Sequence, residues 1–358
     1  MKSSASVWEN LSQPIIGLSP MDGVTDLPFR EICQKYGRPD VLFTEFSSVE
    51  GICRQAVDLL KEFRYLPAQR PIIGQIYGTT PEFFRQSAIL LCELGFDGVD
   101  INMGCPAKNV AHGGAGAALI QTPALAQQII QATQAGVVQW AAGADLAACP
   151  NLSQEIKTAT LQMKLESQTN DLVRRLIPVS VKTRIGFDKI VVQDWLKTLL
   201  EMSPAAITVH GRTLRQLYSG QADWEAIGLA AETVRESGVK TKILGNGDIT
   251  SRAQALSRIS ETKLDGVLIG RASFGNPWIF STEQVELTPE LKAKVALEHA
   301  RLYEQTYGQD KKFSFLPMRK HLSWYTHSFP QARELRSVLV RSNSSSEAEA
   351  IFKQFGLL

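Results

Sequence analysis

The residues best suited to chemistry are polar side chains and one thiol that follow short apolar segments. Cys105 lies in the Gly- and Pro-interrupted break 103–106, directly after the apolar segment 98–102. A thiol with a reference pKa of about 8.5 is mostly protonated at neutral pH and can act as an acid. A single cysteine is more often a small apolar core residue, so Cys105 becomes a catalytic candidate only together with its neighbours.

Other polar groups end further apolar segments in the same way. They are Ser19-Pro20-Met21, Gln75, Asn102, Lys182, Arg184, His210-Gly211-Arg212, Asn246-Gly247-Asp248 and Gly270-Arg271. Considered singly, Lys182 could also be a surface lysine and His210 a histidine packed in the core. Arg184 and Arg212 could be side chains in contact with solvent. Because the carboxyl ends of parallel strands meet at one rim, the convergence of these groups favours a ligand site there.

Glycines suggest where that site would take a phosphate. The run 113–116 lacks the Gly-Lys-Ser/Thr ending of a phosphate loop and is a weak indication. Gly247 and Gly270 follow the last two apolar segments, where barrel enzymes often bind phosphate, and they allow a close backbone approach. Arg271 adds a positive charge at the same place.

The elements that must position these residues alternate along the chain. Strands are expected at 15–20, 41–46, 71–77, 98–102, 177–184, 205–210, 241–246 and 266–270. Helices are expected at 26–36, 81–94, 122–136, 191–201, 224–237 and 251–260, the first capped by Asp26. Eight continuous apolar strands separated by helices predict an α/β fold, a parallel (β/α)8 TIM barrel.

The alternation stops near residue 287. Segments 291–308 and 330–355 have helical spacing without a strand between them, which predicts a small all-helical C-terminal domain. We therefore expect a barrel domain at 1–286 and a helical domain at 287–358. The alanine-rich interval 137–171 has weak apolar spacing and is expected to be an insertion in the barrel.

Composition limits the class of protein. The 358 residues carry a formal net charge of +2, too near neutral to indicate a nucleic-acid binder by itself. Five scattered cysteines without a CxxC pair argue against a disulfide framework or a zinc site and favour a reduced, cytoplasmic setting. No signal-length or membrane-length apolar run is evident, so no membrane association is expected.

Several motifs together resemble those of tRNA-dihydrouridine synthases. They are SPMDGVTDLPFR from Ser19, TEF from Thr44, GQIYG from Gly74, DINMGCPAKNV from Asp100, GGAGAAL from Gly113, VKTRIGFD from Val181, TVHGRT from Thr208, GNGDI from Gly245, IGRA from Ile269 and RKHLSWY from Arg319. The resemblance implies an enzyme that uses FMN, reduced by NADPH, to reduce the 5,6 double bond of uridines in tRNA. It would act on a uridine flipped out of the RNA.

The resemblance also implies roles for individual residues. Cys105 would donate the proton, on the face of the uracil opposite the flavin. The implied cofactor-binding residues are Pro20, Met21, Gln75, Lys182, His210, Asn246, Gly247, Asp248, Gly270 and Arg271. The implied substrate or RNA contacts are Asn102, Lys108, Arg184, Arg319, Lys320 and Trp324. The resemblance also implies that the helical domain 287–358 binds tRNA through the stretch 311–325, extended by Arg333, Arg336 and Arg341. No metal and no protein partner are expected, and the chain is expected to be a monomer.

Three alternatives stay open at this point. The chain could be a flavin barrel that reduces a small molecule, a dihydrouridine synthase that acts on ribosomal RNA, or an RNA-binding barrel without activity. Without the resemblance, the basic and aromatic stretch 311–325 would be an amphipathic helix with Trp324 in a core.

Overall fold

The computed structural model describes residues 6–166, 173–217, 219–327, 329 and 331–358. These residues form two compact units. The first comprises Met1–Asp22 and Asp40–Gly270, and the second comprises Gly23–Pro39 and Arg271–Leu358. The boundary at residue 286 that the sequence predicts between the barrel domain and the helical domain stays a prediction.

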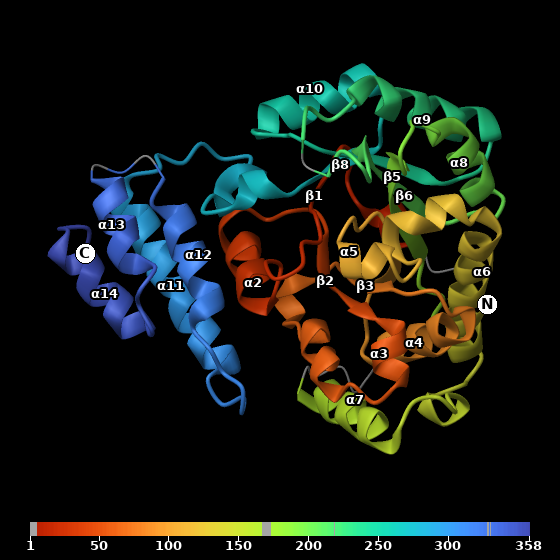
Figure 1. Ribbon diagram of the computed structural model, residues 1–358, viewed down its shortest axis with the longest axis horizontal. Helices are drawn as coiled ribbons and strands as arrows, with labels where there is room; N and C mark the ends of the chain where they lie inside the picture. The colour runs from red at the N-terminus through yellow and green to blue at the C-terminus, as the bar shows by residue number, and fades with distance from the viewer. Residues whose placement is uncertain (1–5, 167–172, 218, 328, 330) are drawn as a thin grey trace. The chain divides into compact units, whose positions relative to one another are not determined.

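The first unit is built on eight parallel strands (Figure 1). They are β1 Ile15–Leu18, β2 Leu42–Ser48, β3 Ile72–Tyr77, β4 Gly98–Met103, β5 Val179–Gly186, β6 Ala206–Thr213, β7 Lys242–Asn246 and β8 Gly266–Ile269. From β2 to β8 each strand pairs with the next along the chain, and β1 pairs with β8. Backbone hydrogen bonds from Leu18 N to Val41 O and from Asp40 N to Ile16 O, both 3.0 Å, join β1 to the two residues directly before β2. These bonds close the sheet, so the predicted (β/α)8 barrel is confirmed.

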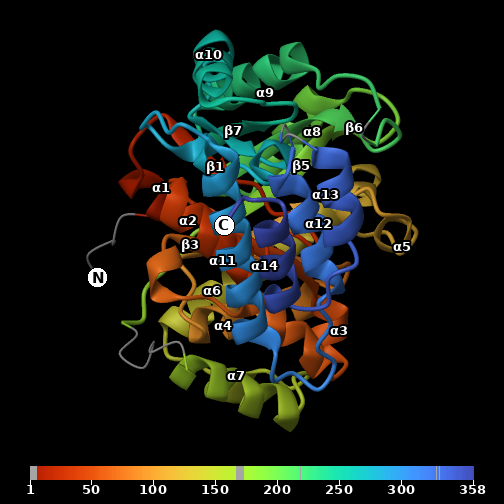
Figure 2. The same cartoon turned by 90° about the vertical axis from the view of Figure 1, so that its left-hand side faces the viewer.

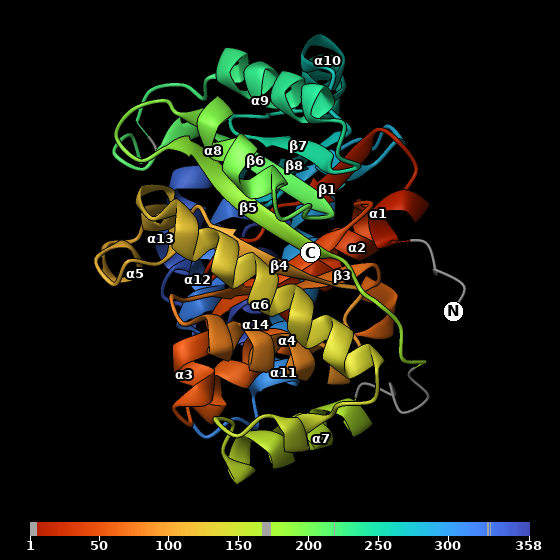
Figure 3. The same cartoon turned by 90° about the vertical axis from the view of Figure 1, so that its right-hand side faces the viewer.

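Helices cover the outside of the strands, as Figure 3 shows for α8, α6 and α4. In α8 the side chains of Trp195, Leu196 and Leu199 are buried, because apolar residues three and four apart share one helix face. The α-helices of this unit are α1 Val7–Asn10, α3 Val49–Cys53, α4 Pro81–Glu93, α5 Lys108–Ala111, α6 Pro123–Ala141, α7 Gln154–Glu166, α8 Val192–Leu200, α9 Trp224–Ser237 and α10 Arg252–Thr262. Short 3-10 helices lie at η1 Val57–Phe63, η2 Pro67–Gln69, η3 Gly116–Gln121 and η4 Leu146–Ala148.

The interval 137–171 is only partly separate from the barrel helices. Helix α6 was expected to end at residue 136 but continues to Ala141, because Val137 and Trp140 remain on its buried face. The interval then forms η4 and α7, an extra helix between β4 and β5. Positions 167–171 of the predicted interval lie outside the described residues.

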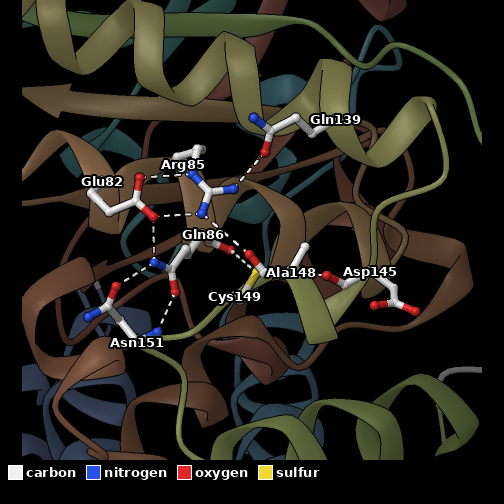
Figure 4. A network of polar contacts seen from close by, with 8 residues as sticks. All are labelled: Glu82, Arg85, Gln86, Gln139, Asp145, Ala148, Cys149 and Asn151. Carbon is white, nitrogen blue, oxygen red and sulfur yellow. Dashed lines mark hydrogen bonds and ion pairs between the residues drawn. The ribbon is translucent and has the colours of Figure 1, made fainter.

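A polar network holds the interval to α4 (Figure 4). Gln86 and Asn151 form a reciprocal pair: Gln86 Nε2 donates to Asn151 Oδ1 at 2.6 Å, and Asn151 N donates to Gln86 Oε1 at 2.9 Å. Arg85 bridges Glu82 on its own helix and Gln139 on α6, at 2.6 Å each. Hydrogen bonds therefore help to anchor the interval, beside buried side chains such as Leu152 and Ile156.

The second unit is helical. It contains α2 Leu27–Tyr36, η5 Arg271–Ser273, η6 Pro277–Phe280, α11 Pro289–Tyr307, α12 Leu316–Tyr325, α13 Ala332–Leu339 and α14 Ser345–Gln354. The last four helices are drawn in blue in Figure 2. The Asp26 side chain accepts from Phe29 N at 2.9 Å, so the predicted cap of α2 is confirmed. The segment with helical spacing at 330–355 forms two helices, α13 and α14, with a turn between them, and position 330 lies outside the described residues.

Buried side chains from these helices form one apolar core. It includes Ile32 of α2, Ala296 of α11, Met318 and Leu322 of α12, and Phe352 of α14. Within the described residues, we find no helix with the length and apolar character needed to span a membrane.

Candidate active site

Polar side chains from four different strands meet in the barrel. Gln75 comes from β3, Asn102 from β4, Lys182 from β5 and Asn246 from β7. Asn102 Nδ2 donates to Gln75 Oε1 at 3.1 Å, and Lys182 Nζ donates to Asn246 Oδ1 at 3.2 Å. Asn102 and Lys182 are also direct register partners in the sheet. The structure therefore brings together four of the residues that the sequence proposed for one rim.

The loop that carries Cys105 is held on several sides. Asn102 Oδ1 accepts from Gly104 N at 3.0 Å and from Cys105 N at 2.8 Å. Arg184 Nε donates to Gly104 O at 2.7 Å, and Ala117 N donates to Cys105 O at 3.1 Å. A loop whose backbone groups are paired in this way holds its side chain in one place, which favours preorganised chemistry.

Cys105 itself lies in a small apolar cluster. It packs with Val110 and Ala115, and the partly buried rings of Phe46 and Tyr77 lie against this cluster. Burial raises the pKa of the Cys105 thiol, and a backbone N–H at Ala107 opposes this shift. The sulfur therefore carries its proton at neutral pH, as an acid must.

The glycine-rich run after Cys105 serves close packing. Gly116 has a φ of +60°, and a Cβ there would lie 2.7 Å from Cys105 O. Only glycine lets η3 begin this close to the thiol loop. This contact explains why position 116 is a glycine without invoking a bound phosphate, in agreement with the weak phosphate-loop pattern.

Two ionisable groups in the barrel have shifted pKa values. Burial, aided by the positive charge of Arg184, lowers the pKa of Lys182 to about 8. Burial raises the pKa of Asp100 to about 6, against hydrogen bonds from Ser180 and Gln75. At neutral pH a buried ammonium and a buried carboxylate are therefore present in one polar layer.

Both arginines that the sequence alone could leave solvated are buried. Arg184 is 3% exposed and Arg212 is 2% exposed. Beyond Gly104, Arg184 Nη1 donates to Thr213 O at 3.0 Å. Arg212 Nη1 and Nη2 donate to the two carboxylate oxygens of Asp248 at 3.0 and 2.6 Å. The solvated interpretation is thus wrong for both, while the predicted RNA contact of Arg184 stays a prediction.

The segment Asn246-Gly247-Asp248 forms a close backbone approach. Gly247 has a φ of +134°, and a Cβ there would lie 2.6 Å from Ala222 Cβ and 3.2 Å from His210 Cδ2. Because Arg212 and Ala222 N hold the Asp248 carboxylate, any part of this position in binding an anion would fall to its backbone.

The remaining predicted cofactor residues follow the ends of strands closely in sequence. Pro20 and Met21 follow β1 and are partly exposed. A Cβ at Gly270 would lie 3.4 Å from Met21 Sδ, so these two positions are close neighbours. Arg271 begins η5 in the second unit and is exposed, and Lys108 is exposed at the start of α5.

The predicted RNA residues of α12 have partners within the second unit. Arg319 Nη2 donates to Asn343 Oδ1 at 2.7 Å. Trp324 stacks on Phe274 with ring centroids 3.9 Å apart, and Lys320 Nζ lies 5.9 Å from the Trp324 ring centroid. Their contact with RNA stays a prediction.

Sequence reasoning missed two residues of the polar layer, Asp100 and Ser180. Ser180 Oγ donates to Asp100 Oδ1 at 2.6 Å, and Gln75 Nε2 donates to Asp100 Oδ2 at 2.7 Å. A carboxylate in the middle of an apolar strand was the available indication, because a buried charge requires partners.

Comparisons with known proteins agree on one family. A family model described as "Dihydrouridine synthase (Dus)" matches residues 17–139 and 142–355. A protein named "Probable tRNA-dihydrouridine synthase" from Staphylococcus aureus (strain COL) is 33% identical over 351 residues, covering 97% of this chain and 95% of its own. "Probable tRNA-dihydrouridine synthase 2" from Bacillus subtilis (strain 168) is 32% identical over 351 residues, covering 97% of this chain and 96% of its own.

Proposed function

The chain belongs to the dihydrouridine synthase family, and from this premise we propose that it reduces the C5–C6 double bond of uridines in tRNA. The observation that carries the proposal is the Cys105 loop, which holds a protonated thiol beside a polar layer of the barrel. We propose FMN as the cofactor and NADPH as the reductant. Bound FMN would supply hydride to one carbon of the uracil.

The residues present fit a flavin nucleotide. The Lys182 ammonium would supply a donor for the carbonyl edge of the ring. The amide nitrogens of Gln75 and Asn246 already donate to Asp100 Oδ2 and Leu268 O, and so hold the polar layer around that lysine. At Gly247 the Cβ position is already taken up by Ala222 and His210, so a contact with a phosphate would be made by the glycine backbone. The Asp248 carboxylate is neutralised by Arg212, so its charge would not repel that phosphate.

Cys105 completes the reduction by transferring its proton. The S–H bond breaks as a C–H bond forms at the second carbon of the double bond, and the thiolate regains its proton from water. Because burial raises the pKa of Cys105, the protonated thiol is the resting form. The paired backbone groups at Gly104 and Cys105 fix the direction in which the Cys105 side chain leaves the backbone.

The test uses purified protein, FMN, NADPH and unmodified tRNA, with dihydrouridine measured by mass spectrometry. We expect product in tRNA, and Cys105→Ala should keep bound flavin while losing activity by about 100-fold or more. Cys92→Ala is the matched control, since it removes another buried thiol, from α4.

Three outcomes would contradict the proposal. Full activity of Cys105→Ala would remove the thiol from the mechanism. Product only in ribosomal RNA would change the substrate, and turnover only of a small enone would replace the function.

A further inference from the structure

A buried carboxylate lies next to the site without a part in the proposed reaction. Asp100 is 1% exposed on β4, and its two oxygens accept from Ser180 Oγ at 2.6 Å and Gln75 Nε2 at 2.7 Å. With a pKa of about 6, it is mainly ionised at neutral pH. An ionised carboxylate accepts hydrogen bonds but cannot donate them.

This restriction determines the orientation of the Gln75 amide. A glutamine amide donates from its nitrogen and accepts at its oxygen, so the carboxylate of Asp100 selects the nitrogen. Gln75 Oε1 must then face the other way, where it accepts from Asn102 Nδ2 at 3.1 Å. Gln75 is fully buried, so water cannot replace either partner.

The same logic continues to the thiol loop. With its Nδ2 on Gln75, Asn102 must present Oδ1 to the opposite side, where it accepts from Gly104 N and Cys105 N at 3.0 and 2.8 Å. A reversed Asn102 amide would place a donor against these two donors. The hydrogen-bond chain from Asp100 to Cys105 therefore has one consistent direction.

We propose that Asp100 is a positioning residue, which acts through the amides of Gln75 and Asn102 to hold the backbone of Cys105 in its reactive arrangement. Its significance for catalysis rests on the proposed function, whereas the positioning itself is a property of the protein alone. The group required at position 100 is an acceptor, and the negative charge is one way to provide it.

The experiment compares three variants by amide hydrogen exchange of residues 102–107 in the flavin-free protein. Asp100→Leu keeps the branching of the side chain but removes the acceptor, and should speed exchange at Gly104 and Cys105 by about tenfold. Asp100→Asn keeps an oxygen for Gln75 and should stay near wild type. Ser180→Ala is the matched control, because it removes the other hydrogen bond to the same carboxylate and leaves the Gln75 link intact.

Alkylation of Cys105 by iodoacetamide and steady-state kinetics provide further readouts. Asp100→Leu should alter the alkylation rate at Cys105 and lower kcat more than it raises KM, and Asp100→Asn should restore both. If Asp100→Leu fails to fold, Gln75→Met breaks the same chain one residue later and should give the same exchange pattern.

Two results would overturn the proposal. Equal exchange in Asp100→Leu and Ser180→Ala would indicate a general loss of stability. Equal exchange in Asp100→Asn and Asp100→Leu would assign the effect to charge. If the exchange pattern appears but the wild-type protein forms no dihydrouridine, the positioning role stands and the proposed function fails.

Discussion

At the scale of single residues, the site combines groups whose protonation states are set by burial. The Cys105 thiol is kept protonated, while Lys182 has a pKa lowered to about 8 and therefore retains most of its charge at neutral pH. A buried ammonium is costly in the protein alone and gains from an electron-rich ligand nearby. This cost gives Lys182 a measurable effect on stability.

Replacing Lys182 by Met should stabilise the flavin-free protein at pH 7, by about 2–5 °C in melting temperature. Between pH 8 and pH 10.5 the unfolded chain holds a proton at this lysine that the folded chain has released. Wild-type stability should therefore rise with pH in this window, and the advantage of the variant should shrink. Thermal unfolding of both proteins across the window measures the difference.

The control is Lys240→Met, which changes an exposed lysine between α9 and β7. It should give a melting difference that does not vary with pH. A constant difference for Lys182→Met as well would mean that the ammonium has no desolvation cost in the folded protein. Weaker FMN binding by Lys182→Met would separately support its predicted role.

The sequence predicted which polar residues belong to the site better than it predicted their hydrogen-bond partners. Gln75, Asn102, Lys182 and Asn246 could be grouped because parallel strands deliver their carboxyl ends to one rim. Arg212 could not be assigned to Asp248, because strand register and side-chain direction bring together positions 36 residues apart. Asp100 was missed for the same reason, since its hydrogen bonds come from two neighbouring strands.

At the scale of elements, the barrel was predictable because the strands carry buried apolar side chains and the helices that cover them, such as α4 and α8, have an apolar face. Helix α9 has the predicted bounds, 224–237, with Asp223 accepting from Ala226 N as its cap. The interval after α6 was not predictable to the same degree, since its attachment to α4 depends on amide and guanidinium groups such as Gln86 and Arg85. Such polar pairs leave no periodic apolar pattern.

The turn after β7 gives a prediction at this scale. Gly247→Ala would force a side chain into a φ of +134° with its Cβ 2.6 Å from Ala222 Cβ. We expect a loss of stability of about 2 kcal/mol or more, because this backbone region is almost restricted to glycine. FMN affinity, measured by fluorescence titration, should fall by about tenfold or more.

The matched control is Gly238→Ala at the end of α9. Gly238 also has a positive φ, +68°, but a Cβ there has no atom within 4 Å. It should cost about 1 kcal/mol and leave FMN affinity unchanged. Equal FMN affinities in the two variants would remove the Gly247 turn from the proposed cofactor site.

At the scale of the whole molecule, RNA binding cannot come from overall charge. The formal net charge is only +2, so attraction to phosphates would depend on where basic side chains are exposed. In the second unit, Lys311 and Arg333 are exposed near α12 and α13 in sequence. Both belong to the segment that we predicted to bind tRNA.

Binding of tRNA should therefore weaken as the salt concentration rises. The slope of the logarithm of the association constant against the logarithm of the salt concentration should depend on these side chains. Neutralising Lys311 and Arg333 together, each to Gln, should reduce the slope by about 1.5 because two phosphate contacts release fewer counterions. Neutralising Lys197 and Lys240, exposed on the first unit, also lowers the net charge from +2 to 0 and should leave the slope unchanged. Filter binding or fluorescence anisotropy over a salt series distinguishes the two pairs. An equal reduction by both pairs would assign the attraction to net charge, and a wild-type slope of zero would exclude the basic C-terminal segment from RNA recognition.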